Sequence, residues 1–334
     1  MEFSFGVLSF NKEKYILETL ESIKYQILHF GKDIKFNIFI TDDCSIDNSV
    51  RLIKNWLSEN ASLFEICQLI ENSQNMGTTY NYEVLLNKIK SNYFKVIAAD
   101  DIFAADNIFE DMNNSESNVF NVTIPIFLNN DTLYFDQGVV RKHFFFQNKK
   151  RDNSYDINKM IYGGYFVTPS IFLSRNLINE KCIKFMRQFF LFEDDPTWYM
   201  VLKNNKNISV NFINSVKVIY RVNSGVSNTC SNPVWNSDFE KFSKIVCKEN
   251  PSFLLKLYKK SKAKHLNHMD SKFSFCFIFD KVNAIFFKIY YFLLKNNELH
   301  NFIHNEKIKN LSYYKELKKI ALSKYVLYMK IIGN

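Results

Sequence analysis

The first hundred residues alternate between short apolar runs and stretches in which apolar residues recur at helical spacing. The apolar runs cover residues 3–10, 36–41, 65–70 and 94–99. After the first run, hydrophobic residues recur every three or four positions, which is typical of an amphipathic helix. Such a β-α-β-α-β-α-β order predicts an α/β fold, with a mostly parallel sheet covered by helices on both faces.

The residues that follow the first apolar run exclude two common nucleotide-binding loops. They read Ser9-Phe10-Asn11-Lys12-Glu13, without a Gly-x-Gly-x-x-Gly fingerprint and without a P-loop. A hydride-transfer enzyme that binds a dinucleotide and a P-loop kinase are therefore both disfavoured.

Pairs of aspartates follow two of the predicted strands, as Asp42-Asp43 and Asp100-Asp101. In open α/β sheets ligands bind beyond the carboxyl ends of the strands. Carboxylates there suit Mg²⁺ or Mn²⁺, which take one or two protein carboxylates together with substrate phosphates. The alternative is that the acids cap helices, such as a short helix beginning near Ile102. Because two separate strands end in this way, we favour the cation site.

A third acidic cluster, Glu193-Asp194-Asp195, stands directly before Pro196. Acidic residues and proline both suit the first turn of a helix, which is a sufficient structural explanation. The functional alternative is that one carboxylate acts as a general base beside an acceptor hydroxyl.

Between the second and third acidic clusters, a mixed basic and aromatic stretch at residues 139–156 is predicted to be a loop over the site.

The composition of the chain limits the classes of partner that the protein is expected to bind. The chain has 334 residues, of which 47% are hydrophobic, and its net charge is +9. A basic protein suits phosphorylated ligands, anionic membranes or nucleic acid, but no nucleic-acid motif is present, so we expect no nucleic-acid partner. The six cysteines never form Cys-x-x-Cys, which disfavours zinc and points to a reducing compartment. Without a leader pattern at its start, the chain is expected to be cytoplasmic.

Six stretches stand in a fixed order along the first two thirds of the chain: Leu8-Ser9-Phe10-Asn11, Asp42-Asp43-Cys44-Ser45-Ile46-Asp47, Asn75-Met76-Gly77 with Asn81, Ala98-Ala99-Asp100-Asp101, Glu193-Asp194-Asp195-Pro196-Thr197-Trp198, and Tyr220-Arg221 with Ser227. In this order the stretches resemble the motifs of family 2 glycosyltransferases of GT-A fold, a Rossmann-like α/β fold. Two positions depart from the family pattern: Ala98 replaces a frequent aspartate of the metal motif, and Asn223 replaces a histidine that some members offer to the metal.

The resemblance implies a role for each matching position. Asp194 would be the base that deprotonates the acceptor hydroxyl, with Glu193 beside it, in a transfer that inverts the anomeric carbon. Asp100 would bind Mn²⁺ or Mg²⁺ and the diphosphate. The residues implied to contact the nucleotide are Ser9, Phe10, Asn11, Asp42, Asn75, Gly77 and Asp100, and those implied to contact the sugar substrates are Asp101, Trp198 and Arg221.

The last third of the chain reads as helical and basic, so we divide the chain into a GT-A domain at residues 1–232 and a helical region at residues 233–334. Residues 273–294 are strongly apolar, yet charged residues interrupt them. This suits a buried helix, or an interfacial helix on an anionic membrane rather than a spanning one. Residues 307–330 continue as a basic amphipathic helix. Contact with the inner membrane face and formation of a homodimer both stay open.

The sequence thus favours a metal-dependent enzyme that moves a sugar from a nucleoside-diphosphate donor, expected to be a UDP-sugar. Its acceptor would be a glycan or a polyprenyl-linked glycan in bacterial surface polysaccharide synthesis, such as capsule, O-antigen or lipooligosaccharide. Because of Ala98 and Asn223, a non-catalytic protein that binds sugar nucleotides or serves in assembly is the alternative.

Overall fold

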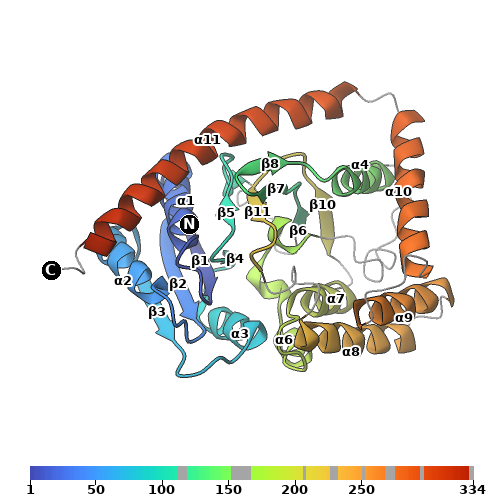
Figure 1. The fold of residues 1–334 in the computed structure, drawn as a ribbon, viewed down its shortest axis with the longest axis horizontal. Coiled ribbons are helices and arrows are strands. Elements are labelled where there is room, and N and C mark those ends of the chain that lie inside the picture. Colours follow the sequence, from blue (N-terminus) through green and yellow to red (C-terminus); the bar gives the residue numbers. More distant parts are fainter. Residues whose placement is uncertain are drawn as a thin grey trace.

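The computed structural model describes residues 1–110, 119–151, 167–205, 208–225, 232–249, 253–267, 275–293 and 297–330. Its central sheet has four parallel strands in the order β3-β2-β1-β4 (Figure 1). Their bounds are β1 Glu2–Ser9, β2 Lys35–Asp42, β3 Ile66–Glu71 and β4 Tyr93–Ala98.

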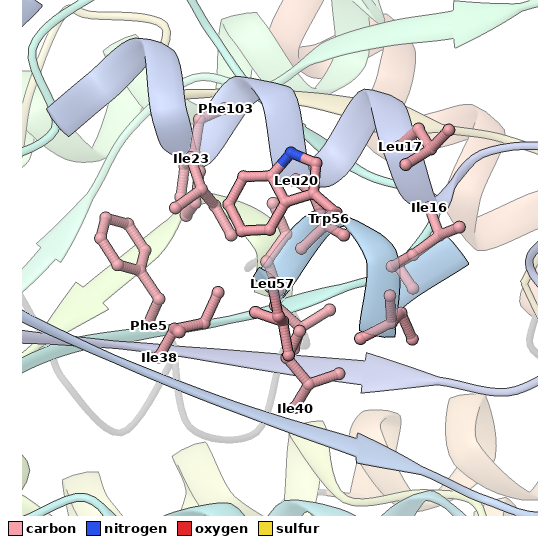
Figure 2. Close-up of a cluster of buried hydrophobic side chains, with 14 of the residues drawn as sticks. Phe5, Ile16, Leu17, Leu20, Ile23, Ile38, Ile40, Trp56, Leu57 and Phe103 are labelled. Atoms are coloured by element: carbon pink, nitrogen blue, oxygen red, sulfur yellow. The ribbon is translucent and has the colours of Figure 1, made fainter. Parts of the chain in front are cut away.

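Helices cover both faces of this sheet, which confirms the predicted α/β class. Side chains of a strand alternate between the two faces, and β2 shows it directly. Ile38 and Ile40 pack in one cluster with α1 (Ile16–Phe30) and α2 (Ser49–Asn60), where Trp56 is fully buried (Figure 2). Phe39 packs on the other face, in the cluster that contains Leu85 and Leu86 of α3 (Thr78–Lys88).

A second, mixed sheet continues from the end of the central one. The helix considered near Ile102 is not there, because Ile102 and Phe103 form the short strand β5 and pair antiparallel with β11. Both residues are fully buried and apolar, which suits a sheet interior better than the first turn of a helix. This sheet has the order β5-β11-β7-β8, with β11 Val218–Arg221, β7 Ile126–Asn129 and β8 Thr132–Tyr134, and a third sheet has the order β10-β6-β9, with β10 Ser209–Phe212, β6 Val119–Val122 and β9 Ile171–Leu173.

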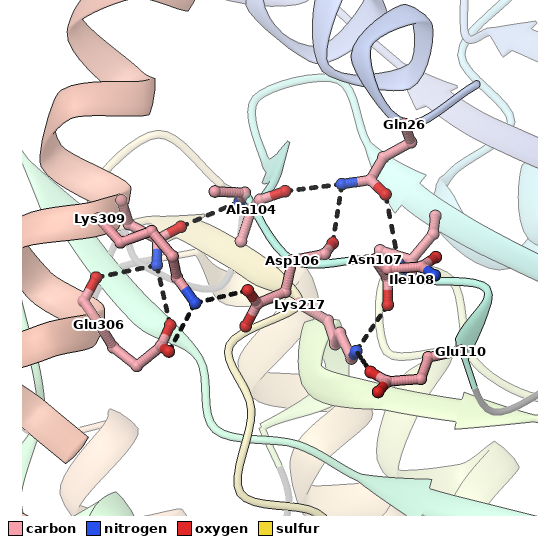
Figure 3. A network of polar contacts seen from close by, with 11 residues as sticks. Gln26, Ala104, Asp106, Asn107, Ile108, Glu110, Lys217, Glu306 and Lys309 are labelled. Atoms are coloured by element: carbon pink, nitrogen blue, oxygen red, sulfur yellow. Dashed lines mark hydrogen bonds and ion pairs between the residues drawn. The ribbon is translucent and has the colours of Figure 1, made fainter. Parts of the chain in front are cut away.

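The segment after β5 is held by polar side chains from three directions (Figure 3). Gln26 donates to the carbonyls of Ala104 (2.7 Å) and Asp106 (2.9 Å). Buried Lys217 donates to the Asn107 carbonyl at 2.6 Å, and Lys309 pairs with the Asp106 carboxylate at 2.5 Å. Buried backbone groups need partners, so this network holds in place the chain that leaves Asp100 and Asp101.

The remaining helices lie around the two smaller sheets. The prediction of a loop at residues 139–156 is wrong for its described part, because α4 spans Gln137–Arg151. Val140, Phe144 and Phe146 are buried, and scattered charges hid this apolar face in the sequence. The other bounds are α6 Glu180–Met186, α7 Asp194–Asn204, α8 Pro233–Glu249, α9 Phe253–Asn267, α10 Phe275–Leu293 and α11 Asn297–Lys330, with 3₁₀ turns at Ala61–Leu63, Thr168–Ser170 and Arg175–Leu177.

The long helix α11 returns to the first part of the chain and packs along α1 (Figure 1). Ala321 and Tyr328 join the same hydrophobic cluster as α1 and α2. Lys318 and the Tyr314 hydroxyl both contact Asp131 in the β7–β8 turn, at 2.5 and 2.8 Å. The division at residue 232 stays a prediction. No helix within the described ranges combines the length and apolarity that crossing a membrane requires.

Candidate active site

Hydrogen bonds tie together the loops that follow β1 and β2. Ser9 Oγ donates to Asp42 Oδ2 at 2.9 Å, and the Asn11 amide donates to Ser45 Oγ at 2.8 Å. Ser45 also donates its own amide and hydroxyl to Asp42, which is only 1% exposed. Asn11 takes a left-handed φ of 52°, which asparagine tolerates better than most residues. The turn leaves Phe10 37% exposed at the rim of the cleft described below.

Asp43 organises the connection between β3 and α3. Its Oδ1 accepts from the Asn72 side chain (3.0 Å) and the Met76 amide (2.7 Å), and its Oδ2 accepts from the Gly77 amide (2.9 Å). Gly77 has a φ of +83°, and a Cβ there would lie 2.6 Å from the Phe190 carbonyl oxygen. Glycine is thus required both by its backbone conformation and by close approach.

Asp100 and Asp101 meet two cations at the end of β4. Lys12 Nζ lies 2.6 Å from Asp100 Oδ2. The Arg221 amide donates to Asp101 Oδ1 (2.9 Å), its Nε donates to the Asp100 carbonyl (2.9 Å), and its guanidinium pairs with Glu18. Burial raises the pKa of Asp101 well above its ordinary value, and the neighbouring Asp100 charge raises it further.

Glu193 and Asp194 stand at the start of α7 and face the same cleft. Asp194 Oδ2 accepts a hydrogen bond from Thr168 Oγ1 at 3.0 Å, and Thr168 in turn accepts from the Trp198 indole N–H at 3.1 Å. Burial, with the Asp195 charge adding to it, raises the pKa of Asp194 to about 6. Burial and the Asp194 charge raise the pKa of Glu193 to about 8. At neutral pH Asp194 is therefore mostly ionised and Glu193 mostly protonated.

These groups line one cleft, with a cavity volume of about 540 Å³. That size falls in the range of small-molecule sites. Most of the predicted site residues line it: Ser9, Phe10, Asn11, Asp100, Asp101, Glu193, Asp194, Trp198 and Arg221. Asp42, Asn75 and Gly77 do not line it, and Asp42 lies behind Ser9. The roles given to all these residues stay predictions.

Among the lining residues that were not predicted, Lys12, Thr168 and Trp235 carry the side chains that bear most on the chemistry of the cleft. Lys12 directly follows Asn11, so its position after the first strand was a usable signal. Nothing in the sequence linked Thr168 or Trp235 to the acidic clusters, because they reach the cleft only through tertiary packing. Ser227 lies outside the described residues.

The expected metal ligand Asp100 can be tested against its neighbours. Its Oδ2 already faces the Lys12 ammonium, Asp101 accepts from the Arg221 amide, and Ala98 offers no ligand atom. No group of three or more His, Cys, Asp or Glu side chains that could hold a metal ion occurs among the described residues. The donor set does not by itself fit a divalent cation, so a metal at Asp100 stays a prediction and no step below depends on it.

Sequence comparison identifies relatives. The family model of glycosyl transferase family 2 matches residues 4–176. The poly(ribitol-phosphate) beta-N-acetylglucosaminyltransferase TarS of Staphylococcus aureus (strain Mu50) is 32% identical over 101 residues. That segment is 30% of this chain and 16% of the relative, so the match spans under a fifth of the relative's length.

Solved structures share the fold over nearly the whole chain. TarS 1–349 of S. aureus matches with a TM-score of 0.56 at 16% identity, covering 96% of this chain and 90% of that one. Its complex with UDP-GlcNAc matches with a TM-score of 0.54 at 17% identity, covering 96% and 91%. The mannosyltransferase PcManGT from Pyrobaculum calidifontis, in complex with GDP-Man and Mn²⁺, matches with a TM-score of 0.50 at 12% identity, covering 98% and 86%.

These likenesses confirm the predicted GT-A fold. The match to the family model covers just over half of the chain, and it includes the strands and turns that carry Ser9, Asp43 and Asp100. The chain therefore belongs to glycosyl transferase family 2.

Proposed function

We propose that this protein is an inverting glycosyltransferase that moves a sugar from a UDP-sugar to a hydroxyl of a bacterial surface glycan or its lipid-linked precursor. The observation that carries the proposal is the convergence of Asp100 and Asp194, from distant parts of the chain, on one cleft. UDP as the nucleotide is supported by the likeness to TarS, whose structure was solved with UDP-GlcNAc.

Asp194 is the general base of the proposed reaction. The acceptor hydroxyl gives its proton to the Asp194 carboxylate while its oxygen forms a bond to the anomeric carbon. The bond from that carbon to the β-phosphate oxygen breaks, and UDP leaves with the electron pair. With a pKa of about 6, Asp194 is ionised at neutral pH yet basic enough to hold the proton, whereas protonated Glu193 cannot accept one.

The test is turnover of a panel of UDP-sugars, measured as UDP release with and without glycan acceptors. Asp194→Asn is expected to lower turnover by roughly 10²- to 10⁴-fold, the usual contribution of general base catalysis. Asp195→Asn is the matched control, because Asp195 does not line the cleft. Its charge adds to the raised pKa of Asp194, so its loss should lower that pKa and reduce turnover far less than Asp194→Asn does. Equal turnover in Asp194→Asn would remove the base, and UDP binding without turnover would favour the non-catalytic alternative.

We further infer that α10 rests on an anionic membrane surface, as a cytoplasmic enzyme with a lipid-linked acceptor would require. Ile278, Val282, Ile285 and Ile289 are each about half exposed. Their spacing of four, three and four residues places them on one face of the helix. The helix lies at the edge of the molecule, away from the β1–β4 sheet (Figure 1).

Charge complementarity selects this partner. Exposed lysines accompany the apolar face, at Lys288 on α10 and at Lys256 and Lys260 on the adjoining α9. An apolar helix face flanked by lysines suits an interfacial position on anionic lipid. The protein should cosediment more strongly with vesicles in which about one third of the lipid is phosphatidylglycerol than with vesicles of pure phosphatidylcholine. Ile285→Asp should weaken this binding about tenfold or more. A dimer that Ile285→Asp dissociates, without vesicle binding, would assign this face to a second copy instead.

A further inference from the structure

A lysine ammonium stands at the place where a cation was expected. Lys12 Nζ lies 2.6 Å from Asp100 Oδ2 and donates to the Ser224 carbonyl at 2.5 Å. The Lys12 side chain is 15% exposed and lines the cleft, and the Asp100 side chain is 5% exposed. The ammonium thus joins the end of β4 to the loop after β11, directly beside the cavity.

The backbone of Lys12 is held before any ligand arrives. Its amide donates to Ser49 Oγ at 2.7 Å, and the carbonyl accepts from Tyr15 and Ile16 at the start of α1. The preceding Asn11 is fixed in its left-handed turn. A cation whose backbone and charge partner are already ordered loses less entropy when it binds a ligand.

The charges around the cleft distinguish Lys12 from Arg221. Both cations line it within the described ranges. Arg221 is occupied by Glu18, by the Asp100 carbonyl and by the ring of Tyr15, over which its guanidinium lies at 4.3 Å. Among the described residues Lys12 has one carboxylate partner and one carbonyl partner, and an ammonium has three donors. One donor therefore remains for a ligand in the cleft that Lys12 lines.

We propose that Lys12, anchored by Asp100, binds the diphosphate of the sugar-nucleotide donor and supplies the positive charge that the departing UDP needs. The inference rests on the proposed function and deepens it. It gives to a side chain the neutralisation that a divalent cation at Asp100 would otherwise provide. Lysine suits this task because its ammonium is a compact charge that binds phosphate oxygens without a fixed geometry.

The experiment compares the original protein with Lys12→Met and Lys12→Arg, in EDTA and in Mn²⁺. UDP binding is measured by calorimetry and UDP-sugar turnover by UDP release. In EDTA, Lys12→Met should weaken UDP binding roughly 10- to 100-fold, as the loss of a charged hydrogen bond implies, whereas Lys12→Arg should keep part of the affinity. Turnover of the original protein should stay within about threefold after chelation, on the premise that a point charge on the chain replaces the metal.

Lys14→Met is the matched control, because it removes the same charge two residues away from an exposed side chain outside the cleft. It should bind UDP as the original does. The inference is overturned if chelation abolishes UDP binding and turnover, or if Lys12→Met binds UDP as tightly as Lys14→Met. Because calorimetry needs no turnover, the two failures are distinguishable: an inactive protein whose UDP affinity depends on Lys12 would refute the proposed function and the role of Lys12 in UDP departure, and would leave only diphosphate binding by Lys12.

Discussion

Two pairs of adjacent carboxylates, on different elements of this fold, are treated in opposite ways by the structure. Asp42 and Asp43, at the end of β2, each accept three hydrogen bonds from hydroxyls, side-chain amides or backbone amides. Glu193 and Asp194, at the start of α7, are half-buried in the wall of the cleft. Asp194 accepts two hydrogen bonds, from the Thr168 hydroxyl and the Asp195 amide, and desolvation raises the pKa of both carboxyls. The hydrogen bonds of the first pair therefore fix the loops around it, whereas the raised pKa values of the second pair suit proton transfer in a reaction.

The largest expected effect on stability comes from Asp43. Asp43→Ala removes the acceptor of the half-buried Met76 amide and leaves the buried Gly77 amide only its longer bond to Asn75 Oδ1, so we expect a loss of about 3 kcal/mol in the free energy of unfolding. Urea denaturation at pH 7 measures it. Asp43→Asn, which keeps one acceptor oxygen, should lose about half as much by the same reasoning. A loss under half a kcal/mol for Asp43→Ala would break the contrast between the two pairs.

Glu193→Gln should act in the opposite direction and stabilise the fold. The folded protein holds the Glu193 proton up to about pH 8, whereas an ordinary glutamate releases it near 4.5. The unfolded chain thus binds fewer protons in this interval, and stability falls as pH rises from 4.5 to 8. Removing the titration should restore on the order of 1 kcal/mol at pH 8, after discounting for water in the cleft.

The measurement is urea denaturation of both proteins at pH 5 and pH 8. The original protein should lose more stability between the two values than Glu193→Gln does. Equal losses in the two proteins would mean that Glu193 is not held protonated.

The smallest expected effect concerns the pKa of Asp194 in the Glu193–Asp194 pair. Thr168 donates to the Asp194 carboxylate and so stabilises its ionised form. In the pH profile of turnover, activity should rise as Asp194 loses its proton near pH 6. Thr168→Val should move this rise upward by about half a unit, which is the weight of one modest hydrogen bond. Thr168→Ser keeps the donor and should leave the profile in place, and a shift in both variants would point to a packing effect.

Local patterns predicted the β1–β4 units well, since strand and helix periods are read from neighbouring residues. They failed at Ile102 and in α4, where burial from distant segments decided the element. Ile102 lies in a strand because β11 pairs with it. In α4, charged residues between the apolar ones obscured the helical pattern in the sequence, although the apolar side chains are buried in the structure.

By itself, the sequence determined the alternation of strands and helices, the acids at the strand ends, and the family to which those motifs belong. These are local properties, because the spacing of hydrophobic residues and the ends of strands can be recognised from consecutive residues. Only the tertiary structure decided that Asp43 holds a loop while Asp194 keeps its basicity, and that Lys12 meets Asp100. Hydrogen-bond saturation, burial and charge pairing depend on which distant segments the fold brings together, and no local pattern records that.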